Sequence, residues 1–210
     1  MNPSSSLLRP FKLRNRIQHY AWGTKGKAAY IPKLLGIEAE PDQPYAELWI
    51  GAHPKAPSEI TLDGTPRSLG QVVASHPQEI LGEAVASRFQ GAWPYLLKVL
   101  SAADSLSLQA HPDKAQAQIL HRRDPEHYPD DNHKPEVAIA LDALTALIGF
   151  RSYDEIVSVL ARYPELAESV EAGVSRRLAA GRGAPESEQR ALFGEFFSAL
   201  IAAAEARSAD

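Results

Sequence analysis

The stretch Ser105-Leu106-Ser107-Leu108-Gln109-Ala110-His111-Pro112 alternates polar and apolar residues without a fault. Successive side chains of a β-strand point to opposite faces, so this alternation predicts a strand that carries Ser107, Gln109 and His111 on one face. A half-solvated strand on the surface of an antiparallel sheet produces the same pattern. Histidine and glutamine are uncommon choices for a solvated strand face, and Pro112 ends the strand directly after the histidine. These two features favour a functional face.

Further strands are predicted on both sides of this stretch. Each candidate is a short apolar run bounded by proline, glycine or polar residues. The candidates cover residues 45–51, 95–100, 137–141 and 144–150. Helices are predicted at 68–89, with a break at His76-Pro77, and at 113–122. The first 150 residues therefore indicate an α+β arrangement.

The chain changes character near Arg151, after which the sequence is alanine-rich and helical. Ser152 and Glu155 form a capping box, which predicts a helix start. After Pro185, apolar residues recur at helical spacing, a stripe that is typical of core packing rather than of a binding surface. We therefore predict one domain over residues 1–151 and the start of a helical domain over residues 152–210.

Gln109, His111 and Glu136 are nitrogen and oxygen donors that could converge on one divalent metal ion. Imidazole and carboxylate groups suit zinc, and a glutamine oxygen is an uncommon but workable third ligand. The spacing has little metal specificity, because Glu136 lies 25 positions after His111. An exposed ion pair of Lys134 and Glu136 at the start of a strand, worth little energy, is the plain alternative.

Lys98 is the single charge in the run Leu96–Leu100, which is otherwise apolar. Burying an unpaired ammonium group is expensive, so this lysine needs either an acidic partner or an anionic ligand. Glu47 shares a predicted strand face with Trp49. Both charged residues are therefore candidates for a site.

Composition excludes several classes of protein. The 210 residues include 22 Lys and Arg against 26 Asp and Glu, for a net charge of −4, with no basic block that would predict nucleic acid or an anionic membrane as a partner. The absence of cysteine excludes a disulfide scaffold and a thiolate metal site. No Walker loop, dinucleotide fingerprint, serine-hydrolase elbow or zincin motif occurs. Residues 1–9 predict no leader peptide, so the cytoplasm is the expected location.

Five stretches in order over residues 15–151 resemble the type I mannose-6-phosphate isomerase family. They are Ile17–Gly23, Ala46–Pro54 with Pro57-Ser58, Pro94–Ser101, Leu106–Lys114, and Asn132–Glu136 continuing through Gly149–Arg151. The resemblance implies a cupin-type, jelly-roll β-barrel with one catalytic zinc ion. The implied reaction interconverts mannose 6-phosphate and fructose 6-phosphate, a step that leads to GDP-mannose.

The resemblance also implies roles for individual residues. Gln109, His111 and Glu136 match three of the four zinc ligands of the family. Lys134 matches a lysine near the substrate, and we take it as the general base or its support. The implied substrate-binding residues are Ser107, Lys98, Trp22, Glu47 and His133.

Two functional residues of the family have no match in this sequence. The fourth zinc ligand of the family is a histidine on a later barrel strand, followed by a catalytic arginine, and residues 152–210 contain no histidine. We therefore expect the N-terminal half of the enzyme, truncated before the barrel is complete, with open strand edges. The full-length protein is expected to be a monomer. The alternatives are an inactive fragment that binds metal or sugar phosphate, and metal-dependent chemistry on another sugar.

Overall fold

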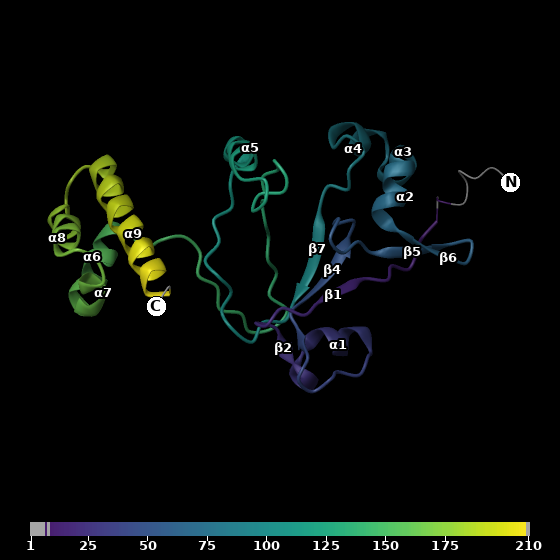
Figure 1. Ribbon diagram of the computed structural model, residues 1–210, viewed down its shortest axis with the longest axis horizontal. Helices are drawn as coiled ribbons and strands as arrows, with labels where there is room; N and C mark the ends of the chain where they lie inside the picture. The colour runs from purple at the N-terminus through teal and green to yellow at the C-terminus, as the bar shows by residue number, and fades with distance from the viewer. Residues whose placement is uncertain (1–6, 8, 209–210) are drawn as a thin grey trace. The chain divides into compact units, whose positions relative to one another are not determined.

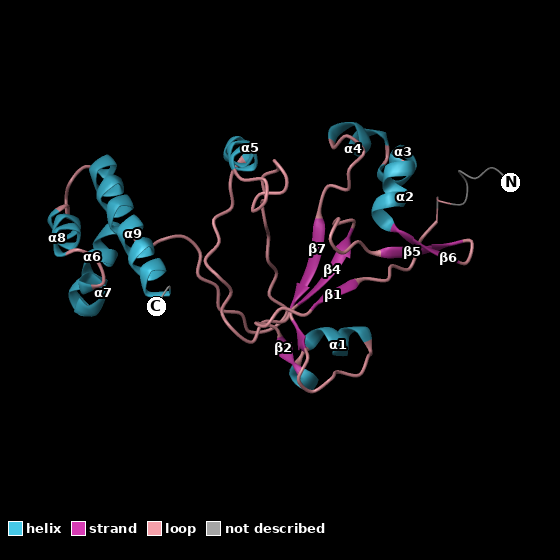
Figure 2. Cartoon of the chain, in the orientation of Figure 1, coloured by secondary structure: helices cyan, strands magenta, loops and turns pink. Residues whose placement is uncertain are grey.

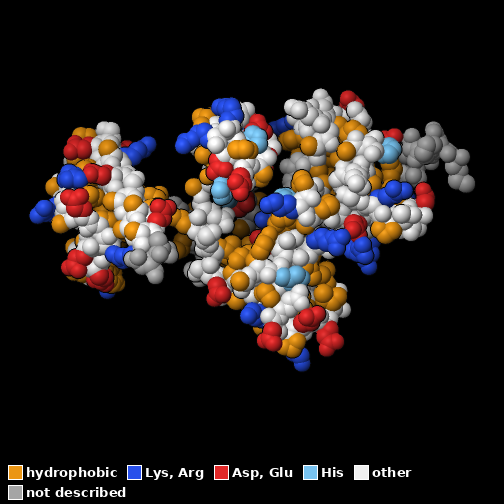
Figure 3. All heavy atoms as spheres, in the orientation of Figure 1, with side chains coloured by type: hydrophobic (Ala, Val, Ile, Leu, Met, Phe, Trp, Pro, Cys, Tyr) orange, Lys and Arg blue, Asp and Glu red, His pale blue; other side chains and the backbone are white. Residues whose placement is uncertain are grey.

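The computed structural model describes residue 7 and residues 9–208 (Figure 1). Most of the stretch 1–9, which is expected to carry no leader, thus lies outside the described residues. The chain divides into two compact units, residues 1–135 and 136–210, and each is described separately. Acidic and basic side chains of the described residues are interspersed on the visible face of each unit (Figure 3).

The first unit is built on a small antiparallel sheet. Its strand order is β1-β4-β7, so the central strand is β4. Two further strand pairs, β2 with β3 and β5 with β6, are separate from this sheet. The strands are β1 (Arg16–Gln18), β2 (Thr24–Lys25), β3 (Pro44–Tyr45), β4 (Glu47–Gly51), β5 (Glu59–Leu62), β6 (Thr65–Ser68) and β7 (Leu96–Leu100).

Short helices lie between these strands, and a further one, α5, follows the last strand β7 (Figure 2). They are η2 (Gly26–Ala28), α1 (Tyr30–Leu35), α2 (Leu69–Ser75), α3 (Pro77–Leu81), α4 (Glu83–Arg88) and α5 (Lys114–Arg123). The predicted break at His76-Pro77 is confirmed, because Pro77 begins a new helix. The predicted helix at 113–122 is also confirmed, and Asp113 forms a capping box with Gln116.

Two groups of buried apolar side chains hold the first unit together. One joins α1 to strands β3 and β4, and the other joins β5 to α2. Their buried members are Ala29, Ile31, Tyr45 and Leu48 in the first group, and Ile60, Leu69, Val72 and Val73 in the second. Leu48 points away from Glu47 and Trp49, its neighbours along β4, because side chains alternate along a strand. The core on one face thereby fixes the polar residues of the other.

The second unit is helical from residue 153 onward. Its helices are α6 (Tyr153–Arg162), α7 (Pro164–Glu168), α8 (Ala172–Ala180) and α9 (Glu186–Ser208). The capping box predicted at Ser152 and Glu155 is present at the start of α6. Val174, Leu178 and Phe196 are buried between α8 and α9, so the predicted apolar stripe does form a core. No described helix has the length and apolar character needed to cross a membrane.

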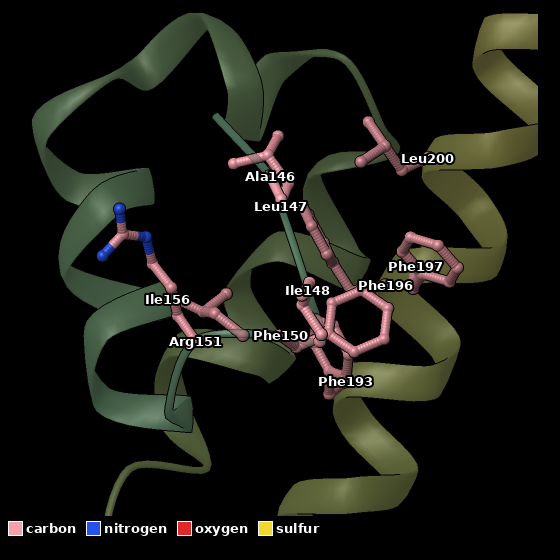
Figure 4. Close-up of a pocket in the computed structure, with 11 residues that line it drawn as sticks. Ala146, Leu147, Ile148, Phe150, Arg151, Ile156, Phe193, Phe196, Phe197 and Leu200 are labelled. Carbon is pink, nitrogen blue, oxygen red and sulfur yellow. The ribbon is translucent and has the colours of Figure 1, made fainter. Parts of the chain in front are cut away.

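A segment before α6 lies against α9 and forms an apolar pocket of about 530 Å³ (Figure 4). Phe150 packs edge to face against Phe193 and Phe197, with ring centroids 4.8 and 5.0 Å apart. Leu147 and Ile148, in the same segment, are 98% and 92% exposed. This segment is thus only partly covered by its own unit.

Three predicted strands are wrong for this structure: residues 105–111, 137–141 and 144–150 are loops in the described chain. The predicted strands at 45–51 and 95–100 are confirmed as β4 and β7. A strand is stable only when its backbone groups pair with a neighbour. Among the described residues, no strand pairs with any of the three segments, and no closed barrel forms. The expected barrel strands are therefore unpaired loops in the described chain.

Leu178→Ala tests whether the second unit has its own core. Leu178 is 0% exposed, and the truncation is expected to lower the free energy of unfolding of α6, α8 and α9 by about 2–5 kcal/mol. Leu166→Ala, at a half-exposed position, is expected to cost about 1 kcal/mol. Hydrogen exchange of the amides in these helices measures both changes. Equal losses would show that Leu178 is not a core residue.

Candidate active site

Strands β4 and β7 place three candidate side chains on one face of the sheet. Glu47 and Trp49 are two positions apart on β4, and Lys98 on β7 lies directly opposite Trp49 in the register. Residues two apart on a strand, and residues directly opposite on paired strands, share a face. The pairing thus brings the carboxylate, the indole and the ammonium group together.

Glu47 is the centre of this group and is only 6% exposed. Its Oε2 atom accepts a hydrogen bond from Nε1–H of Trp49 and lies 3.4 Å from Nζ of Lys98. The same ammonium group lies 5.3 Å from the centroid of the Trp49 ring. Lys98 therefore has the acidic partner that its apolar surroundings require, and a cation–π contact in addition. Its side chain remains 32% exposed, so it is open to an anionic ligand.

His53 packs against this group from the turn that follows β4. Its ring makes an edge-to-face contact with Trp49, with centroids 4.5 Å apart. The turn is closed by the amide of Ala56, which donates to the carbonyl oxygen of His53 at 3.0 Å. The amide of Lys55 donates to Nδ1 of the His53 ring at 3.2 Å. Both the backbone and the ring of His53 are thus held.

Burial and nearby charged groups change the pKa of His53. Burial is the largest cause that lowers the pKa of His53 below its ordinary value. Nearby charges follow in decreasing order: Lys55, Lys98 and Lys134 lower this pKa further, and Asp130 raises it. The charges of Asp130 and Lys134 therefore act on the ring of His53, which follows β4.

Lys134 is paired with Asp130, with Nζ 3.2 Å from Oδ2. The backbone amide of Asn132 donates to Oδ1 of the same carboxylate at 2.9 Å. Burial raises the pKa of Asp130, but the Asn132 amide and Lys134 outweigh it, so this pKa lies below its ordinary value. Lys114 on α5 secures the loop from its other side, because its Nζ atom donates to the carbonyl oxygen of Asp131 at 2.9 Å.

Trp22 contacts Tyr20, a residue affected by the charge of Glu47. The two rings are stacked with centroids 5.9 Å apart. Burial, and then the charge of Glu47, raise the pKa of Tyr20 above its ordinary value. The carbonyl oxygen of Trp22 also accepts hydrogen bonds from the amides of Ala103 and Asp104, just after β7. Trp22 thus packs on Tyr20, the residue whose pKa is raised by the charge of Glu47.

The predicted metal ligands, and the predicted substrate-binding residues Ser107 and His133, are exposed. Ser107, Gln109 and His111 are exposed in the loop between β7 and α5, and His133 is exposed beside Lys134. Glu136 is the first residue of the second unit, so the set of Gln109, His111 and Glu136 is divided between the units and its convergence stays a prediction. Three or more His, Cys, Asp or Glu side chains are nowhere grouped as a metal site in the part of the chain that the structure describes.

Sequence reasoning missed three members of the site as functional candidates: Trp49, His53 and Asp130. The alternation along β4 does place Trp49 beside Glu47, which was a usable signal. His53 and Asp130 lie in turns outside any strand pattern. They become candidates only through their interactions with Lys98 and Lys134 in the folded chain.

Comparison with known proteins places the chain in a family. Residues 10–153 match the family model described as "Phosphomannose isomerase type I, catalytic domain". The chain belongs to this family. Mannose-6-phosphate isomerase of Rattus norvegicus is 42% identical over 196 residues, which is 88% of this chain and 46% of the rat protein. The Saccharomyces cerevisiae protein of the same name is 38% identical over 209 residues, covering 93% of this chain and 48% of its own length.

Solved structures of phosphomannose isomerase from Salmonella typhimurium are similar to this chain. One mutant aligns with a TM-score of 0.70 and 37% identity over 94% of this chain and 51% of the solved chain. The enzyme bound to fructose 6-phosphate and zinc aligns with a TM-score of 0.67 and 36% identity, over 94% of this chain and 52% of the solved chain. The chain spans about half the length of the phosphomannose isomerases that it matches.

Proposed function

We propose that the protein is a zinc-dependent aldose–ketose isomerase that interconverts mannose 6-phosphate and fructose 6-phosphate. One observation carries the proposal: the Salmonella isomerase bound to fructose 6-phosphate and zinc is 36% identical over 94% of this chain. The matched family model, residues 10–153, also includes every candidate site residue. We further propose a cytoplasmic monomer whose partner is a small sugar phosphate.

Gln109, His111 and Glu136 would hold the zinc ion. Their donor atoms are nitrogen and oxygen, which suit zinc, and all three side chains are exposed rather than enclosed in the core. When bound, the metal supplies Lewis acidity that stabilises negative charge on substrate oxygens. A fourth ligand, by the family pattern a histidine, would complete the set.

The remaining residues would bind the sugar phosphate and move protons. Moving the carbonyl group between C1 and C2 requires removal of a proton from one carbon and its return to the other, through an enediol. Lys134 would take part in this transfer or support it, once substrate loosens its pair with Asp130. Lys98, partly exposed beside Glu47, and Ser107 would bind the phosphate, whose binding energy orients the reacting carbons.

The proposed catalytic domain is a cupin-type barrel to which residues 1–151 contribute, with a helical domain beginning at residue 152. Such a barrel would need to cover residues 105–111, 137–141 and 144–150, which are loops in the described chain. Their apolar side chains support this, since Leu108, Val137 and Ile139 are largely exposed in the described chain. Covering them would be favourable by about 25 cal/mol per Å² of apolar surface.

The decisive experiment measures turnover of mannose 6-phosphate and bound zinc, for this 210-residue chain and for the protein in its natural length. The proposal requires that the natural protein binds zinc stoichiometrically and turns the sugar over. Binding of metal or sugar phosphate without turnover in either form would favour the second candidate, a binding protein.

Removal of the metal is expected to abolish turnover. Treatment of the natural-length protein with a chelator should lower kcat by at least about 10³-fold, because the charge of the enediol loses its main stabilisation. Zinc added back should restore activity, whereas magnesium should not, since imidazole ligands favour zinc. Full activity in the apoprotein would contradict zinc dependence.

A further inference from the structure

The ring of His53 is held in one tautomer by the turn that carries it. The amide of Lys55 donates to Nδ1 at 3.2 Å, and a backbone amide nitrogen can only donate. Nδ1 must therefore be the unprotonated, accepting nitrogen. In a neutral imidazole the single proton then lies on Nε2, so His53 presents Nε2–H as a hydrogen-bond donor.

The surroundings keep this ring uncharged. One side of it packs on Trp49, whose other neighbour is the ammonium group of Lys98. Lys55, Lys98 and Lys134 all disfavour a further positive charge, and Asp130 is the carboxylate that opposes them. A proton on Nδ1 would in addition face the Lys55 amide, donor against donor. Burial, charge and hydrogen bonding thus act in the same direction.

Nε2–H of His53 has no acceptor among the described residues. The ring is half-buried at the edge of the site and fixed at both its backbone and Nδ1. A donor that is oriented in advance stabilises negative charge on a ligand without reorganisation. The lysines supply the attraction for an anion, and His53 supplies a directional, neutral donor.

We propose that His53 donates its Nε2–H to a carbonyl or hydroxyl oxygen of the bound sugar phosphate. This inference rests on the proposed isomerase function. A neutral imidazole can polarise a carbonyl oxygen without giving up its proton, which suits an oxygen that gains negative charge as the enediol forms. His53 transfers no proton in this role, so it complements Lys134 rather than replacing it.

The first test reads the ring directly and needs no turnover. In the ¹⁵N NMR spectrum of the ring, Nδ1 of His53 should be the unprotonated nitrogen at neutral pH, and Nε2 should carry hydrogen. Fructose 6-phosphate should shift the Nε2–H resonance downfield, whereas inorganic phosphate should not. A proton on Nδ1, no shift with fructose 6-phosphate, or an equal shift with inorganic phosphate would each overturn the proposal.

The second test uses a matched pair of variants in the natural-length protein. His53→Phe keeps a ring against Trp49 but removes the donor, and should lower kcat by about 10²-fold. His53→Gln keeps a neutral N–H donor, and should retain kcat within about 10-fold of the parent. Protonation of His53 should also give the parent an acid limb in its kcat profile that His53→Gln lacks. Equal losses in both variants, with an unchanged acid limb, would reduce His53 to a packing residue.

The two proposals can fail separately. If the parent protein does not turn over mannose 6-phosphate, the proposed isomerase function fails, and the NMR titration with fructose 6-phosphate still decides whether His53 contacts the sugar. If the parent is active and His53→Phe is equally active, the isomerase function stands and the role of His53 fails. Cooperative unfolding of each variant, measured in urea, confirms that the comparison is made on folded protein.

Discussion

Replacing Lys134 with alanine should lower kcat for mannose 6-phosphate by about 10²- to 10⁴-fold in the natural-length protein, with a smaller change in KM. A positioned proton-transfer group acts mainly in the transition state, so its loss appears in kcat. The ammonium group of Lys134 lies 3.2 Å from Asp130, and its charge lowers the pKa of His53, whose ring packs on Trp49. Steady-state kinetics measures the effect.

Lys114→Ala is the matched control for this prediction. Lys114 holds the same loop through the carbonyl oxygen of Asp131 and pairs with its carboxylate at 3.1 Å. It has no assigned part in the chemistry, so its removal should change kcat by less than about 5-fold, as expected for an exposed ion pair. If Lys134→Ala leaves kcat unchanged, Lys134 is not part of the mechanism. If both variants lose activity equally, Lys134 acts only by ordering the loop.

Glu47→Ala should be the most destabilising single truncation at the site, lowering the free energy of unfolding by about 2–3 kcal/mol. Most of the loss comes from Nε1–H of Trp49, a buried donor left without an acceptor, which costs about 1–3 kcal/mol. Lys98 also loses its partner, but its side chain is about one third exposed, so solvent screens this contribution. Urea unfolding followed by tryptophan fluorescence measures the change.

Two further variants separate the hydrogen bond from the ion pair. Glu47→Gln keeps an oxygen that can accept from Trp49 and should cost about 1 kcal/mol. A double-mutant cycle of Glu47→Gln with Lys98→Met then reports the coupling energy of the charged pair. Glu38→Ala, at an exposed position on the loop after α1, should change stability by less than about 0.5 kcal/mol. A similarly small effect of Glu47→Ala would show that Glu47 is not the centre of the site.

Local features were readable in the residues alone. The capping boxes at Asp113 and Ser152 involve contacts three residues apart, so the sequence is sufficient to locate the starts of α5 and α6. Alternation along β4 places Glu47 beside Trp49, and the need of Lys98 for a partner follows from its apolar neighbours. The family motifs likewise identify these positions without any coordinates.

The pairing of strands that are distant in the sequence could not be predicted from the alternation of polar and apolar residues. Alternation predicts which residues share a face but not which strand lies beside them, and residues 105–111 are unpaired in the described chain although their pattern is perfect. His53 and Asp130 have no periodic signal. His53 joins the site through its ring contact with Trp49, and Asp130 through its pair with Lys134. The sequence thus specified the helix starts, the strand faces and the family. The partner of Lys98 and the neutral ring of His53 depend on contacts between residues distant in the chain, since strand register and burial exist only once the chain has folded.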